Sequence, residues 1–145
     1  MRLNPDALAC AIEFLKTRDR SRAEVEAKLA AKGFQNAEIE AVLDRLESRK
    51  IIEDERIAQG IASLDAGIGP GRMRAKMAKL GLDESTVDSA LVHFDDETQL
   101  TQMRQLIIKR KFTVSDRAMA ARFLISRGFD EELVMQAIES EFGDE

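Results

Sequence analysis

The sequence predicts an all-α fold of three tandem three-helix repeats that form an elongated, curved array. The 145-residue chain is rich in helix-forming residue types, with two prolines and neither Trp nor Tyr. Three similar phrases recur with Gly33, Gly81 and Gly128 in register, 48 and 47 residues apart, and so regular a period indicates repeats. Apolar residues before each glycine follow the i, i+4 spacing of a helix, as at Val25 and Leu29.

Each repeat is expected to contain three helices, the second of which ends at the register glycine. The first helices are predicted within residues 5–18, 54–67 and 97–111. Residue types that cap a helix stand twelve positions before each glycine, at Ser21, Gly69 and Asp116. Pro70 then occupies a first-turn position, where its missing N–H costs nothing. The predicted repeats are residues 1–50, 51–95 and 96–145.

The register glycines are expected to end their helices with a positive φ, so that the chain can reverse. An apolar anchor follows each glycine, and a capping residue then begins the third helix. The anchors are Phe34, Leu82 and Phe129, and the expected caps are Asn36, Asp83 and Asp130. Because helices of about a dozen residues are marginal alone, contacts between adjacent repeats should add to their stability.

Composition limits the class of protein. The formal net charge is −5, which argues against a protein that coats nucleic acid through bulk charge. The single Cys10 cannot form an internal disulfide, and no N-terminal leader pattern is seen, so a reducing cytoplasm is expected. No apolar run approaches the roughly 20 residues that cross a bilayer, which predicts no membrane role.

Catalytic chemistry has few candidates in this sequence. His93 is the only histidine, so a Cys/His metal site has too few ligands, and Cys10 is expected to be a small buried filler. The segment "GIGPGR", residues 67–72, fits neither phosphate-loop pattern and is interpreted as a turn and helix start. Acidic clusters at residues 53–55 and 95–97 suit helix ends. We expect no enzyme activity, metal, cofactor or small-molecule substrate.

Charge is segregated by segment, and the basic segments are the better functional candidates. Residues 68–82 carry only basic charges, and residues 83–97 carry acidic charges with no Lys or Arg. Arg72, Lys76 and Lys79, here called the basic ridge, follow helical spacing beside an apolar stripe. A second group lies in "IIKRKF", residues 107–112, where the helix dipole also favours cations. Each group is either a solvated face or a contact surface for phosphates or an acidic partner.

Four phrases resemble the RecX family of recombinase regulators: "SRAEVEAKLAAKGF", "EDERIA", "GIGPGRMRAKMAKLG" and "ARFLISRGF". The resemblance runs nearly from end to end and rests on the order and spacing of these phrases. It implies three tandem three-helix repeats and binding in the helical groove of the RecA–DNA filament, where such proteins restrain the recombinase. ATP would be hydrolysed by RecA and not by this chain.

Two sets of residues are predicted to matter. The predicted contacts with the RecA filament or DNA are Arg22, Lys28, Arg72, Arg74, Lys76, Lys79, Lys109, Arg110 and Lys111. The predicted structural residues of the repeat are Gly33, Phe34, Gly69, Pro70, Gly81, Gly128 and Phe129.

Three functions are open to a chain with these features. The first is a regulatory protein that binds RecA filaments and modulates strand exchange and ATP hydrolysis, by inhibition or by stabilisation of the filament, with DNA as a weak, salt-dependent second partner. The second is a helical module that binds DNA without RecA through residues 72–79. The third is a helical-repeat enzyme or scaffold, which no catalytic constellation supports.

Overall fold

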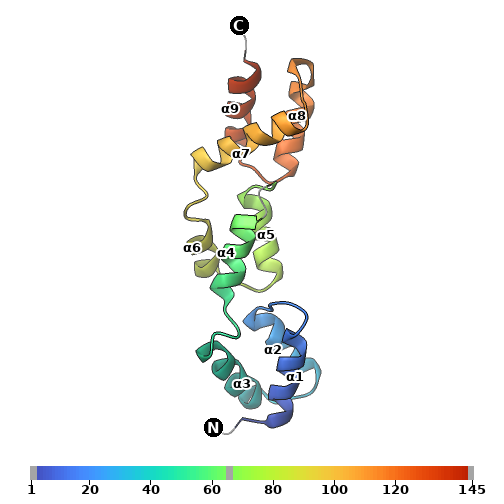
Figure 1. The fold of residues 1–145 in the computed structure, drawn as a ribbon, viewed down its shortest axis with the longest axis vertical. Coiled ribbons are helices and arrows are strands. Elements are labelled where there is room, and N and C mark those ends of the chain that lie inside the picture. Colours follow the sequence, from blue (N-terminus) through green and yellow to red (C-terminus); the bar gives the residue numbers. More distant parts are fainter. Residues whose placement is uncertain (1–2, 65–66, 144–145) are drawn as a thin grey trace.

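The computed structural model describes residues 3–64 and 67–143, and within them it contains helices and no strand. The described elements are α1 (Pro5–Leu15), α2 (Arg22–Ala31), α3 (Asn36–Ser48), α4 (Asp54–Leu64), α5 (Pro70–Lys79), α6 (Glu84–Leu91), α7 (Asp96–Lys109), the 3₁₀ helix η1 (Val114–Asp116), α8 (Arg117–Ser126) and α9 (Glu131–Phe142). Figure 1 shows an elongated molecule with the chain ends at opposite poles. The predicted all-α array of three-helix repeats is confirmed.

The second helices of the first two triplets begin as predicted, and all three end at their register glycines, whereas the Asp116 carboxylate accepts from the Thr113 amide and does not cap α8. Ser21 caps α2 through a reciprocal pair of hydrogen bonds: its Oγ accepts from the Glu24 amide at 3.1 Å, and its own amide donates to the Glu24 carboxylate at 3.0 Å. Gly69 is the N-cap of α5, with Pro70 as its first residue. The three register glycines have φ values of 93°, 78° and 94°, which a residue without a Cβ adopts at little cost.

Local details differ from the predictions at several helix ends. Asn36 is the first residue of α3 and not its cap, because Gln35 holds that position and its amide donates to the Glu38 carboxylate at 2.9 Å. The extra 3₁₀ turn η1 precedes α8. The first helix of the second triplet was expected to reach residue 67, but it is described only to Leu64, and residues 65–66 lie outside the described residues.

Each triplet has its own hydrophobic core. In the first, Val25, Leu29 and Leu43 are fully buried where α1, α2 and α3 meet. Met73 and Met77 of α5 are fully buried in the second core, and Met103 and Leu124 play the same part in the third. The predicted repeat bounds at residues 50 and 95 stay a prediction, since the half-buried Phe94 packs against both the second core and the third.

Adjacent triplets are joined end to end through their second helices. The Gly69 amide, at the start of α5, donates to the Arg127 carbonyl at the end of α8 over 2.8 Å, and the Gly71 amide donates to the Gly128 carbonyl over 3.0 Å. At the other joint, the Ser21 hydroxyl at the start of α2 donates to the Leu80 carbonyl at the end of α5. Figure 1 shows α8, α5 and α2 one above the other along the molecule.

Both joints use the same register. Ser21 and Gly69 are each the N-cap of a second helix, and the carbonyls they contact belong to the residue just before a register glycine. The two backbones approach very closely at the joint between the second and third triplets: a Cβ on Gly69 would lie 2.6 Å from backbone atoms of Gly128 and Phe129. The carbonyls at one helix end thus satisfy donors at the start of the next helix.

Candidate interaction surface

The basic ridge lies on the outer side of α5. Arg72, Lys76 and Lys79 are all exposed, while Met73 and Met77 of the same helix are fully buried. The i, i+4 and i+7 spacing therefore places three cationic side chains along one exposed strip of the second triplet. Such a strip is able to contact several anionic groups at once.

Arg74 is on the same helix but has a partner within the chain. Its guanidinium lies 3.0 Å from the Asp88 carboxylate of α6, and the two side chains are 50% and 59% exposed. An exposed pair of this kind is worth about 0.2–1 kcal/mol and is easily given up. Arg74 therefore faces α6 in the free protein, apart from the basic ridge.

The second basic group lies where α7 ends. Lys109 is the last residue of α7, Arg110 is its C-cap, and Lys111 follows with φ 59°. All three side chains are exposed, and the Arg110 guanidinium stacks over the Phe123 ring at 4.3 Å from its centre. This contact between α7 and α8 fixes the direction of one of the three cations.

Arg127 connects the two basic groups and is absent from the predicted contacts. Its Nε donates to the Gly67 carbonyl at 2.8 Å, and its guanidinium lies 5.9 Å from the same Phe123 ring that Arg110 covers. The neighbouring Gly128 packs directly on the backbone of Arg72. The joint between the second and third triplets thus brings Arg72 close to Arg127, although 55 positions separate them in the sequence.

Arg22 is engaged in ion pairs within the first triplet. Its guanidinium contacts three carboxylates of α3, those of Glu47 at 2.6 Å, Glu40 at 2.9 Å and Asp44 at 3.3 Å. Burial alone would lower the pKa of Arg22, but these carboxylates outweigh it and the pKa is raised. The structure therefore uses Arg22 to hold α2 against α3.

The backbone of Arg22 has a second contact, at the joint with the second triplet. Its amide donates to the Asp54 carboxylate at the start of α4 over 2.9 Å. Burial raises the pKa of Asp54, and this hydrogen bond only partly offsets the rise. Arg22 thus links three helices of two triplets.

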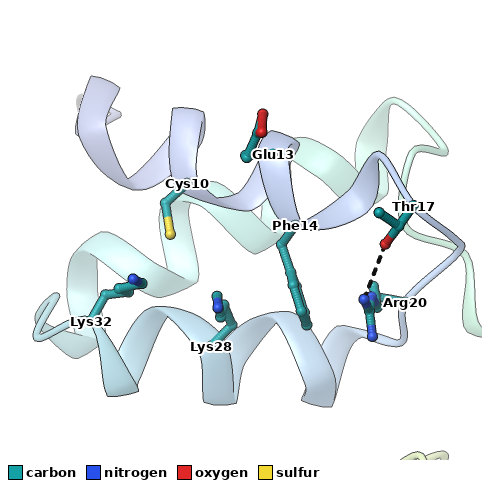
Figure 2. A pocket seen from close by; sticks show the side chains of 7 residues that line it. All are labelled: Cys10, Glu13, Phe14, Thr17, Arg20, Lys28 and Lys32. Carbon is teal, nitrogen blue, oxygen red and sulfur yellow. Dashed lines mark hydrogen bonds between the residues drawn. The ribbon is translucent and has the colours of Figure 1, made fainter.

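Lys28 borders a groove between α1 and α2 (Figure 2). Arg20 and Lys32 border the same groove, with Phe14 and Cys10 contributed by α1. Cys10 is half-buried at the edge of the first core, so the prediction of a buried filler is wrong about its exposure. Arg20 and Lys32 are absent from the predicted contacts. The i, i+4 spacing of Lys28 and Lys32 is the sequence pattern that could have placed Lys32 beside Lys28.

Neither a metal site nor a membrane-spanning helix is found in the described parts of the chain. Residues 3–64 and 67–143 contain no group of three His, Cys, Asp or Glu side chains suited to a metal ion. Across the same residues, no helix combines the length and the apolar character that crossing a membrane requires. His93 is exposed after α6.

Known proteins share both the sequence and the fold of this chain. Residues 7–46 match the family model for the first three-helix domain of RecX. The regulatory protein RecX of Thermus thermophilus is 34% identical over 136 residues, which cover 93% of this chain and 92% of that protein. The chain belongs to the RecX family. Another RecX, from Pseudomonas fluorescens, is 28% identical over 88% of this chain and 86% of its own length.

Crystal structures of RecX proteins have the same fold. RecX from Lactobacillus salivarius superposes with a TM-score of 0.83 over 95% of each chain, at 21% identity. A second RecX structure gives a TM-score of 0.76 over 92% of this chain and 71% of the other. The sequence relatives are named regulatory proteins, and the chain is accordingly a member of a regulatory family.

Proposed function

We propose that this RecX-family protein binds RecA nucleoprotein filaments and inhibits their strand exchange and ATP hydrolysis, and so regulates DNA repair and the SOS response in the cytoplasm. In this role the chain is a binding protein without a catalytic centre. RecA is the principal partner, and DNA is a weaker, salt-dependent one.

The observation that carries the proposal is membership of a regulatory family together with an elongated array of basic surfaces. A helical filament repeats the same protomer surface, so a long ligand made of repeated units is able to contact successive protomers together. The basic ridge and the end of α7 supply cations to two of the three triplets. Several modest contacts made at once give tight binding without a deep pocket.

A filament assay tests the proposal. RecA is assembled on single-stranded DNA with ATP, the purified protein is added over a wide concentration range, and co-sedimentation and ATP hydrolysis are followed. We expect the protein to sediment with the filament and the hydrolysis rate to fall. Unchanged hydrolysis with no co-sedimentation would contradict the proposal.

The basic ridge is tested by charge reversal. The variant Arg72→Glu, Lys76→Glu, Lys79→Glu should lose filament binding and retain its helix content by circular dichroism. The matched control reverses three exposed cations at the end of α3, by Arg45→Glu, Arg49→Glu and Lys50→Glu. If both variants lose binding equally, net charge and not the ridge is responsible.

The alternative is a module that binds DNA without RecA through residues 72–79. Its four cations are Arg72, Arg74, Lys76 and Lys79, of which Arg74 pairs with Asp88 of α6. Four contacts with duplex DNA predict a log–log salt slope of about −3.6, from roughly −0.9 per phosphate. A salt slope of this size combined with no effect on RecA would favour this alternative. Pull-down from a lysate would separate the RecA and DNA hypotheses from a general scaffold, because it identifies the partner.

A further inference from the structure

The groove between α1 and α2 has three cations among the seven described residues that line it. It has a volume of about 480 Å³. Arg20 precedes α2, and Lys28 and Lys32 extend from one side of that helix toward α1, as Figure 2 shows. Phe14 and Cys10 point toward α2 from the opposite wall. The three cations therefore follow one side of the groove over the length of α2.

Arg20 contacts two other residues of the groove lining. Its guanidinium lies 4.1 Å from the centre of the Phe14 ring, and its Nη2 donates to the Thr17 hydroxyl at 3.2 Å. The side chain is only 19% exposed, and its Nε is buried with no hydrogen-bond partner in the described residues. Glu24 is 3.9 Å away, at the limit of an ion pair, and its closer partner is Arg18 at 2.7 Å.

The two lysines have no carboxylate partner among the residues that the structure describes. Lys28 lies 5.2 Å from the centre of the Phe14 ring, and Lys32 follows one turn later. Glu13 is the one acidic residue of the described groove lining, but its carboxylate pairs with Lys16 at 2.9 Å and points away from the lysines in Figure 2. The groove lining thus carries a net positive charge, because its three cations outnumber its one carboxylate.

We propose that the groove binds the phosphate groups of a nucleic acid strand, held by Arg20, Lys28 and Lys32 without contact to the bases. Figure 2 shows Arg20 and Lys28 on either side of the Phe14 ring, so the ring offers no free face on which a base can stack. Point charges on lysines and the planar fork of an arginine are the groups that bind backbone phosphates.

An acidic protein segment fits this groove less well. Peptide grooves obtain most of their affinity from a few anchor side chains that fill desolvated apolar pockets. Here Phe14 is covered by cations, and Cys10 adds only a small apolar surface. Phosphate contacts need no such anchor, because counterion release supplies their free energy.

Cys10 makes the proposal testable at the groove itself. It is the only cysteine in the chain, and its thiol points toward α2. A strand lying in the groove should therefore shield it from iodoacetamide, a neutral alkylating reagent. When the concentration of free oligonucleotide is about nine times its Kd, about a tenth of the protein is unliganded. The alkylation of Cys10 should then slow about tenfold. The probe is an oligothymidylate, with its binding followed in parallel by fluorescence anisotropy.

Two variants with the same change in charge separate the groove from the rest of the surface. Lys28→Gln, Lys32→Gln should abolish the protection and make the log–log salt slope shallower by about 1.4, from roughly 0.7 per phosphate of a single strand. Arg45→Gln, Arg49→Gln, at the end of α3, should leave both unchanged. Protection is measured against the unliganded alkylation rate of each variant, so that each variant serves as its own reference.

Several results would overturn the proposal. Alkylation at an unchanged rate while anisotropy reports saturation would place the strand elsewhere. Protection by tripolyphosphate but not by the oligonucleotide would assign the groove to a free phosphate chain, and protection by polyglutamate alone would assign it to an acidic protein. No recombinase is present in this experiment, so the groove and the RecA proposal can each fail without the other.

Discussion

The amide of Gly69 at the start of α5 donates a hydrogen bond of 2.8 Å to the carbonyl of Arg127 at the end of α8. This contact joins two triplets through main-chain atoms alone. The Arg127 side chain adds a second contact, from its Nε to the Gly67 carbonyl. The joint therefore depends on a close approach of backbones at Gly69.

We expect Gly69→Ala to open or rotate this joint. Its φ of −95° suits any residue, so the effect would come from the Cβ, which would lie 2.6 Å from Gly128. The small-angle scattering profile should change and the Gly71 amide should exchange faster, while circular dichroism stays the same. Gly60→Ala is the control, because nothing lies within 4 Å of its Cβ and the helix should gain up to about 1 kcal/mol. Identical scattering from both variants would show that the joint tolerates a side chain.

Lys50→Gly should stabilise the protein. Lys50 has φ 58° after α3, a conformation that costs a residue with a Cβ roughly 1–2 kcal/mol. Allowing for the entropy of glycine in the unfolded chain, we expect a gain of about 0.5–1 kcal/mol in the free energy of unfolding by urea. Arg49→Gly is the control, since φ at Arg49 is −95° and the same replacement there should destabilise. A loss of stability at both positions would mean that Lys50 bears no strain.

Arg22→Gln should destabilise the first triplet by about 1 kcal/mol, because it removes charge-assisted contacts with three carboxylates of α3. Arg74→Gln is the comparison, since it breaks one exposed pair and should cost about half as much or less. Urea unfolding measures both. Lost filament binding with unchanged stability would instead make Arg22 a contact residue.

The stability contributed by Glu24 should disappear in acid. Burial would raise the pKa of Glu24, but hydrogen bonds from Arg18 and the Ser21 amide outweigh it and the pKa is lowered. The unfolded chain then binds more protons in this range, so the contribution is complete above about pH 4.3 and is lost as pH falls through the folded pKa.

The measurement compares Glu24→Gln with the parent protein by urea unfolding between pH 7 and pH 3. The difference in free energy of unfolding should be largest near neutrality and shrink toward pH 3. Glu26→Gln, at an exposed site on the same helix, is the control and should give a small difference at every pH. A difference for Glu24→Gln that does not change with pH would contradict the assignment.

The helix ends were largely predictable from the sequence because local chemistry determines them. A glycine at the end of a helix has a positive φ at Gly33, Gly81 and Gly128, and Ser21 and Asp83 accept hydrogen bonds from the first turn as capping residues do. The predicted N-cap of α3, Asn36, is wrong by one residue, because Gln35 and Glu38 form the cap. Lys111 has a positive φ where glycine is usual, and residue type alone gives no sign of it.

The surfaces were less predictable, because they depend on contacts between distant segments. The exposed strip of α5 follows from helical spacing, but the contact of Arg127 with Gly67 arises only when two triplets meet. Arg20 reaches Phe14 across the turn between α1 and α2, at a separation of six residues that no helical pattern marks. The three ion pairs of Arg22 likewise depend on how α3 packs against α2.

The matched register of the two joints has a consequence for how proteins of this kind change in length. One joint pairs main-chain amides with main-chain carbonyls and the other pairs the Ser21 hydroxyl with a main-chain carbonyl, and all of these groups lie at the ends of second helices. A duplicated unit of 47 or 48 residues would therefore carry both halves of a joint with it. Such an insertion would extend the molecule by one step and leave the existing hydrophobic cores intact. Duplication of a whole unit therefore preserves the cores and the joints of this architecture. Insertion of part of a unit would leave one joint without its partner.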